Sequence, residues 1–272
     1  MINSHNNHPF HNQEEWQTLL SGIRALAQTE ILQRFRQVSF EEKQDGSLLT
    51  EADTQMQKHT KAFLQKQWPE FAFLGEEASH DEQVQALESS KGCWILDPVD
   101  GTSNFASGIP FYSVSLALAI EGQIVAGLVY DPDRDEMFAA RLGMGAELNG
   151  EKLVAQTAKT QLKQTSGIID FKRLSPKMAM HIIEKTPYAS QRSFGSVALD
   201  WCWIAAGRGH IYLHGSQNLW DYAAGYLILD EAGGQSCTLE GEEVMVAEVV
   251  KRSAVCATTP TLFKQWIDFL EI

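Results

Sequence analysis

Two aspartates three positions apart, Asp97 and Asp100, are the residues whose types and spacing favour chemistry most strongly. They lie in the stretch WILDPVDGT at residues 94–102, where an apolar run precedes the first aspartate. Pro98 fixes one φ angle and favours a turn that would bring both carboxylates together. Carboxylates and backbone carbonyls are the hard oxygen ligands that Mg²⁺ prefers, and the glycine lets backbone N–H groups approach a phosphate. The stretch therefore indicates a cation site beside an anion site.

Three further acidic residues occupy strand ends and helix starts, where α/β folds place ligands. Glu76 follows a strand-like segment, Asp221 opens a helical pattern, and Asp53 follows Thr50 by three residues at the start of another helix. Each feature has an ordinary structural explanation when it is taken alone. Asp-Pro and Asp-Gly are common turn sequences, Gly-Glu-Glu suits a solvated loop, and an acidic residue favours any helix N-terminus. Their occurrence together, in this order, favours one shared site.

The first half of the chain must position these acids with a mixture of helices and strands. Apolar residues recur at three- and four-residue steps from Glu14 to about Gln37, which predicts an amphipathic helix, and Thr50 predicts the N-cap of a second. Asn149-Gly150 is a strong signal for a hairpin turn. Strands are predicted at residues 71–74, 94–96, 112–120, 123–130 and 136–141.

The second half alternates short strands and helices, so we expect an α/β arrangement after an α+β first half. The strands are predicted at 166–170, 210–213 and 254–257, and the helices at 197–206, 221–232 and 261–270. We predict a flexible polar tail at 1–13, an α+β subdomain at 14–155 with most metal ligands, and an α/β subdomain at 156–272 with the substrate pocket and the last ligand. The early histidines at 5, 8 and 11 are assigned to the tail rather than to a metal site.

Composition limits the classes of partner. The 272 residues carry a formal net charge of −13, which repels nucleic acids and anionic membranes, so we expect no direct nucleic-acid or membrane partner. A phosphate ester would be repelled too, unless bound metal cations supply positive charge. The four scattered cysteines form no C-x-x-C pair, and the N-terminus has no apolar signal segment. These features predict a protein of the reducing cytoplasm.

Together the motifs resemble the inositol monophosphatase family of magnesium-dependent, lithium-sensitive phosphatases. One family signature is matched by WILDPVDGTSNF at 94–105 and a second by WDYAAGYLILDEAGG at 220–234. The GEE element at 75–77 and the LTEAD element at 49–53 fall in the expected order, and the resemblance covers residues 14–270. It implies a layered α/β/α/β/α sandwich of the sugar-phosphatase type, usually a homodimer.

The resemblance also implies two to three Mg²⁺ ions per site. One ion would be held by Glu76, Asp97 and the backbone carbonyl of Val99, and a second by Asp97, Asp100 and Asp221. A third, looser ion would contact Glu76 and water molecules.

The mechanism implied is direct transfer of the phosphoryl group to water, without a phosphoenzyme. A metal-bound water ionises more readily than bulk water; Glu76 and Thr102 would activate it, with Asp53 supporting Thr102. Backbone amides of Gly101 and Thr102 would bind phosphate oxygens, so catalysis is mainly positioning and electrostatics. A mobile loop containing Lys43 and Asp45 would help to close the site.

The substrate-binding residues implied are Asp100, Gly101, Thr102, Ser103, Gly195, Ser196, Val197, His214 and Asp221. His214 departs from the animal inositol enzymes, which carry a glutamate there that binds a ring hydroxyl. The sequence leaves open whether His214 contacts substrate or only forms the pocket rim. Because a neutral histidine tolerates added negative charge better than a glutamate, we predict that His214→Glu raises selectivity for inositol monophosphate over bisphosphorylated esters.

We therefore expect a Mg²⁺-dependent phosphomonoesterase acting on inositol 1-phosphate or a similar small sugar or polyol phosphate. One alternative is the same chemistry on fructose 1,6-bisphosphate, histidinol phosphate or a 3′-phosphoadenosine nucleotide, although Ser103-Asn104-Phe105 favours the inositol-type branch over the nucleotide branch. Another is a regulatory protein that binds a protein partner through the same fold.

Overall fold

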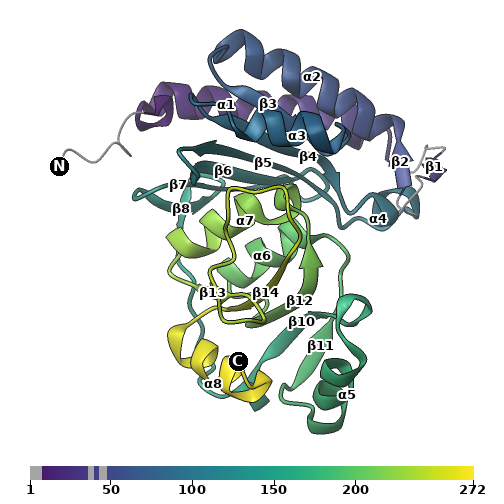
Figure 1. Cartoon of the computed structure of the whole chain (residues 1–272), viewed down its shortest axis with the longest axis vertical. Helices are drawn as coiled ribbons and strands as arrows, with labels where there is room; N and C mark the ends of the chain where they lie inside the picture. The colour runs from purple at the N-terminus through teal and green to yellow at the C-terminus, as the bar shows by residue number, and fades with distance from the viewer. Residues whose placement is uncertain (1–7, 36–39, 43–47) are drawn as a thin grey trace.

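Five layers, α/β/α/β/α, make up the fold in this computed structural model (Figure 1). The structure describes residues 8–35, 40–42 and 48–272. Helices α1 and α2 cover one face of a seven-stranded sheet, α6 and α7 lie between that sheet and a five-stranded one, and α5 and α8 cover the far face of the second sheet. The layered sandwich expected from the sequence is confirmed.

The first sheet is antiparallel except for the parallel pair β3–β4. Its strands, in spatial order, are β3 (Ala72–Gly75), β4 (Cys93–Asp100), β5 (Ser113–Ile120), β6 (Gln123–Asp131), β7 (Glu136–Arg141), β8 (Gly145–Leu148) and β9 (Glu151–Leu153). A separate pair is formed by β1 (Phe40–Glu42) and β2 (Leu48–Thr50). Asn149 and Gly150 take positive φ angles of 52° and 82° between β8 and β9, which confirms the predicted hairpin turn.

Helices of the first half begin where capping signals place them. The helix α2 (Glu51–Gln67) is capped by Thr50, and Asp53 completes a capping box, as predicted. The helix α1 (Gln13–Ala27) continues as a π-helical turn at Gln28–Leu32. Two further helices, α3 (His80–Leu87) and α4 (Thr102–Ala106), were not predicted.

The chain passes from the first sheet to the second between Leu153 and Ser166. In spatial order the second sheet contains β11 (Ser190–Arg192), β10 (Ser166–Asp170), β12 (Ile211–Gln217), β14 (Arg252–Ala257) and β13 (Gln235–Cys237). The accompanying helices are α5 (Pro176–Lys185), α6 (Val197–Ala205), α7 (Leu219–Glu231) and α8 (Pro260–Leu270). Most residues of α6 and α7 are buried, because these helices lie between two sheets.

Residues 8–13 do not belong to a flexible tail. Phe10 is fully buried, and its ring packs edge-on against Trp16, Trp68 and Trp94 at centroid distances of 5.1–5.8 Å. The polar composition of the first residues concealed this anchor, because one aromatic side chain gives no periodic pattern. His8 is buried beside it, whereas residue 5 lies outside the described residues, as do Lys43 and Asp45.

No helix in the described part of the chain is both long and apolar enough to cross a membrane. All four cysteines are free, and Cys93, Cys202 and Cys256 are buried, as expected of small hydrophobic residues.

Replacing Phe10 with alanine should destabilise the protein by about 3–5 kcal/mol, because the change leaves a cavity among three tryptophans. Urea denaturation monitored by tryptophan fluorescence measures the change. Ile183→Ala serves as the control, since Ile183 is 56% exposed and its truncation should cost less than about 0.5 kcal/mol. Equal effects of the two substitutions would show that the N-terminal segment is not part of the core.

Candidate active site

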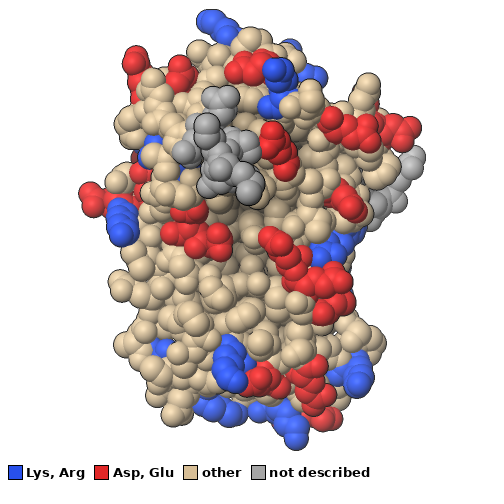
Figure 2. Space-filling view, turned by 60° about the vertical axis from the view of Figure 1, so that its left-hand side comes forward, with Lys and Arg blue, Asp and Glu red and all other residues tan. Residues whose placement is uncertain are grey.

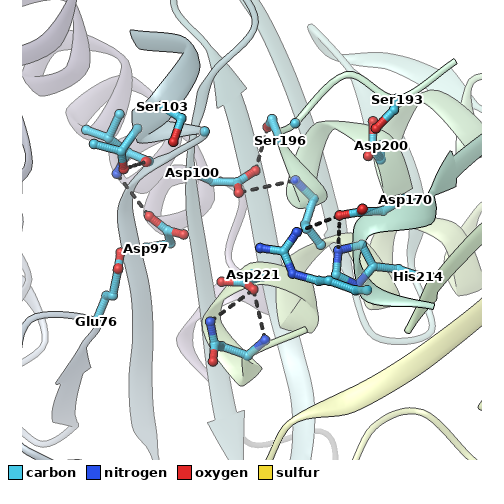
Figure 3. Close-up of a pocket in the computed structure, with 17 residues that line it drawn as sticks. Glu76, Asp97, Asp100, Ser103, Asp170, Ser193, Ser196, Asp200, His214 and Asp221 are labelled. Atoms are coloured by element: carbon cyan, nitrogen blue, oxygen red, sulfur yellow. Dashed lines mark hydrogen bonds and ion pairs between the residues drawn. The ribbon is translucent and has the colours of Figure 1, made fainter. Parts of the chain in front are cut away.

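A cavity of about 180 Å³ lies where the end of β4 and the strand β12 meet the N-terminal ends of α4, α6 and α7 (Figure 3). Among the described residues, every catalytic, metal-ligating or substrate-binding residue predicted from the sequence lines it except Asp53, which lies behind Thr102. The remaining lining residues, which the sequence analysis did not single out, are Asp170, Arg173, Ser193, Asp200 and Asn218. Segments from both halves of the chain therefore form one site.

A bulge in β4 brings its two aspartates to the same cavity. Asp97 pairs with Ser115 and Asp100 with Ser113, so three steps along β4 correspond to two along β5. Side chains three residues apart in a regular strand point to opposite faces, and the extra residue cancels that alternation. The expected turn at Pro98 is therefore wrong: the strand continues to Asp100, and a bulge does what the turn was expected to do.

Asp100 joins the two halves of the molecule. Its Oδ2 accepts hydrogen bonds from Ser196 Oγ at 2.5 Å and from the N–H of Ala198 at 2.8 Å, and its Oδ1 accepts one from the N–H of Val197 at 3.2 Å. These donors belong to the start of α6, whose dipole also favours a negative charge. Burial nevertheless outweighs them and raises the pKa of Asp100 to about 6.

Burial and mutual repulsion also raise the pKa values of the neighbouring acids. Burial raises the pKa of Asp97 well above its usual range, and the charges of Glu76 and Asp100 add to the effect. Burial, followed by repulsion from Asp100, raises the pKa of Asp221 to about 8. Asp221 does not open α7 as expected; it is the third residue of the helix, and its Oδ2 accepts from the N–H of the N-cap residue Asn218 at 2.8 Å.

Figure 3 shows the carboxylates of Glu76, Asp97, Asp100 and Asp221 directed into the same space. Among the described residues, no three Asp, Glu, His or Cys side chains are arranged closely enough to enclose one ion. Oδ1 of Asp97 accepts a hydrogen bond from the N–H of Val99, and Oδ2 of Asp221 accepts one from the N–H of Asn218. The hard oxygen donors and the uncompensated negative charge fit a divalent cation by their chemistry, while the assignment of each ligand stays a prediction.

Thr102 is held by two groups at the end of β4. Its hydroxyl lies 2.9 Å from the carbonyl oxygen of Val99 and 3.3 Å from Oδ1 of Asp53. Asp53 is fully buried, and its Oδ2 accepts from both the N–H and the hydroxyl of Thr50. Gly101 precedes the first turn of α4 with a φ of 92°, a left-handed conformation that side chains disfavour.

His214 does not point a free polar atom at the cavity. Its ring is buried, and Nδ1 accepts from the N–H of Ser216 at 3.2 Å. The proton of the neutral ring must then lie on Nε2, which faces Asp170 Oδ2 at 3.2 Å (Figure 3). Burial lowers the pKa of His214, so the neutral form is favoured. The ring positions Asp170, and a glutamate at position 214 would face the Asp170 carboxylate. The selectivity predicted for His214→Glu therefore no longer follows.

The model of the inositol monophosphatase family matches residues 12–268 of this chain. The chain belongs to that family. Membership places the protein among the phosphoric monoester hydrolases, and it explains why the two motif segments at 94–105 and 220–234 both meet at the cavity.

Individual family members agree with this assignment. An inositol-1-monophosphatase of Caulobacter vibrioides is 31% identical over 231 residues, which cover 83% of this chain and 88% of the relative. The Nus factor SuhB of Pasteurella multocida is 35% identical over 210 residues, covering 73% and 74%. The solved IMPase structure from Thermotoga maritima superimposes with a TM-score of 0.83 at 25% identity, covering 95% of this chain and 97% of the other.

In the absence of divalent cations, the stability of this inositol monophosphatase family member should fall as pH rises. The pKa values of Asp100, about 6, and Asp221, about 8, in the folded protein exceed those in the unfolded chain. Protonation of these two groups therefore stabilises the fold fully below about pH 4, and this stabilisation is lost as pH rises through the folded-state pKa values. We expect the Tm in EDTA to drop by at least about 5 °C between pH 5 and pH 8.

The variant Asp221→Asn is the control for this prediction. It lacks one of the titrating groups, so its Tm in EDTA should fall less over the same interval and should exceed that of the wild type at pH 8. If the Tm values of the two proteins in EDTA fell by the same amount between pH 5 and pH 8, the result would contradict the raised pKa of Asp221.

Proposed function

We propose that this protein is a Mg²⁺-dependent phosphomonoesterase that hydrolyses inositol 1-phosphate or a similar small polyol phosphate. The proposal depends on the group of buried carboxylates Asp97, Asp100 and Asp221, whose pKa values are raised chiefly by burial and whose charges are not balanced by the cavity's Arg173, because that side chain is paired with Asp170. A phosphate dianion would be repelled from such a cavity unless cations entered with it.

Two or three Mg²⁺ ions would be held by residues already present in the cavity. Glu76, Asp97 and the carbonyl of Val99 would hold one, and Asp97, Asp100 and Asp221 a second, as the family resemblance implies. When bound, such ions neutralise phosphate charge and lower the pKa of water. The side chains offer only hard oxygen atoms, which agrees with Mg²⁺ rather than with a softer transition metal.

The remaining residues of the site position the water and the phosphate. Thr102 donates its hydroxyl proton toward Val99 or Asp53, so its lone pairs are free to accept a hydrogen bond from an attacking water. Glu76 on the adjacent strand end is the candidate base for that water. The first turn of a helix leaves backbone N–H groups without partners inside the helix, and Gly101 lets a phosphate oxygen approach them at the start of α4.

Activity measurements on a panel of phosphate esters distinguish between the alternative substrates. A small cavity and relatives named inositol-1-monophosphatase favour a substrate of sugar size. Fructose 1,6-bisphosphate, histidinol phosphate and a 3′-phosphoadenosine nucleotide remain alternatives for the same chemistry. Phosphate release measured over the panel, with and without Mg²⁺, ranks them by kcat/KM.

We also propose that the protein acts as a cytoplasmic homodimer, as the family resemblance implies. Light scattering tests the dimer.

Figure 2 shows acidic and basic side chains interspersed over one face of the molecule. That pattern, with a net charge of −13, argues against direct binding of nucleic acid.

A regulatory role is supported separately by the similarity to a protein named Nus factor SuhB. Such a role would use a protein partner and would not require phosphate release. Affinity capture with wild-type and Asp97→Asn proteins separates the two roles, because partner binding that survives loss of activity does not depend on catalysis.

The variant Asp97→Asn should lose phosphatase activity by at least about 10³-fold while remaining folded. The change removes a charge that both cation sites would share and relieves repulsion in the metal-free cavity, so the Tm in EDTA should be unchanged or higher. Phosphate release at saturating Mg²⁺ is the measurement. Activity within tenfold of the wild type would contradict the metal assignment.

Lithium should inhibit at millimolar concentration in the presence of Mg²⁺. Li⁺ is close to Mg²⁺ in size but carries half its charge, so beside Asp100 and Asp221 it would retain product without supporting turnover. Initial rates in LiCl and NaCl at equal ionic strength test this expectation. The same inhibition by both salts would mean that the second cation site is absent or insensitive to lithium.

A further inference from the structure

An ion pair lines the side of the cavity opposite Asp97. Arg173 Nη1 donates to Asp170 Oδ2 at 2.5 Å, and the same oxygen faces His214 Nε2 at 3.2 Å (Figure 3). Oδ1 of Asp170 accepts from the backbone N–H of Lys172 at 2.9 Å. Burial opposes ionisation of Asp170, but the hydrogen bonds from His214 and Arg173 and the positive charge of Arg173 hold its pKa below its usual range. The carboxylate is therefore ionised and fixed in place.

The backbone holds Arg173 close to the strand that carries His214. A Cβ atom added to Gly215 would lie 1.9 Å from the carbonyl oxygen of Arg173, so only glycine lets the two segments approach this closely. The pairing of β12 with β14 also shifts register between His214 and Gln217, so Gly215 lies in an irregular part of the strand. The position of Arg173 beside the cavity is thus built into the fold.

The pair offers hydrogen-bonding atoms without net charge. The guanidinium group has five N–H donors, and among the described residues its hydrogen bond to Asp170 uses Nη1 alone. The Arg173 side chain is 47% exposed and that of Asp170 is 19% exposed, so both remain accessible from the cavity. Because Asp170 balances the charge of Arg173, this side of the cavity has little attraction for a second anionic group on a substrate.

We propose that Asp170 and Arg173 are specificity-determining residues that together bind neighbouring hydroxyl groups of the leaving alcohol. This rests on the proposed phosphatase function. The carboxylate accepts a hydrogen bond from one hydroxyl, and the guanidinium donates to the oxygen of the next. The neutral pair selects monophosphates of uncharged polyols and disfavours esters with a second phosphate.

Two substitutions with opposite charge effects test the proposal. Asp170→Asn leaves Arg173 uncompensated, so the ratio of kcat/KM for fructose 1,6-bisphosphate to that for inositol 1-phosphate should rise about tenfold. Arg173→Gln leaves the carboxylate uncompensated, so the same ratio should fall about tenfold. The control Lys172→Gln removes an equal charge one residue away, outside the cavity lining, and should change the ratio less than twofold.

Hydrolysis of p-nitrophenyl phosphate separates specificity from structural damage. Its leaving group has no neighbouring hydroxyls, so the Asp170 and Arg173 variants should lose less kcat/KM on it than on inositol 1-phosphate, and the Lys172→Gln control should retain wild-type kcat/KM within about threefold. Parallel losses on all three esters, shifts of the ratio in the same direction, or shifts under twofold in both variants would overturn the proposal.

Binding measurements keep this test independent of turnover. If the wild-type protein releases no phosphate from any ester with Mg²⁺, the proposed function fails. The affinities of the two sugar phosphates, measured by calorimetry on the same variants, then take the place of kcat/KM. Opposite shifts in the affinity ratio would support the role of the pair, and unchanged ratios would refute it.

Discussion

The central electrostatic problem of this fold is the repulsion between carboxylates that are withdrawn from water. Asp97, Asp100 and Asp221 surround one cavity, and the buried environment makes ionisation of each costly. The fold offsets part of that cost at Asp100, where α6 supplies three hydrogen-bond donors. The remaining charge is left for protons or cations to balance, which couples the stability of the protein to the ligands that its chemistry needs.

The position of the cavity between two sheets explains how one chain assembles such a site. The bulge at the end of β4 presents two aspartates, and the helices of the middle layer point their N-terminal ends at the same space. Asn104 secures the junction, since its side-chain amide donates to the carbonyl oxygens of Phe111 at 2.8 Å and Phe194 at 2.6 Å. The segments that carry the predicted metal ligands and substrate contacts are therefore held as a unit.

The layered fold and most of the cavity lining were predicted from the resemblance to the inositol monophosphatase family, whereas the helix cap and the hairpin turn were predicted from local signals. Thr50 and Asp53 form the expected capping box, and the hairpin at Asn149 has the expected turn. The bulge in β4 escaped prediction because it is defined by pairing with β5, and Phe10 because its burial depends on three tryptophans distant in sequence. The five-residue helix α4 is too short to show periodicity. The contact between His214 and Asp170 also escaped prediction, because Asp170 ended a predicted strand and nothing in the local sequence showed which residue it would contact.

Proton release on binding of Mg²⁺ is a direct test of whether cations replace protons on the buried carboxylates. Calorimetric titration of the metal-free protein at pH 7, repeated in two buffers with different ionisation enthalpies, counts the protons exchanged. Because burial and repulsion raise the pKa of Asp221 to about 8 and also raise that of Asp97, we predict saturable binding with release of about one proton or more. Binding without proton release, or no binding at millimolar Mg²⁺, would contradict it.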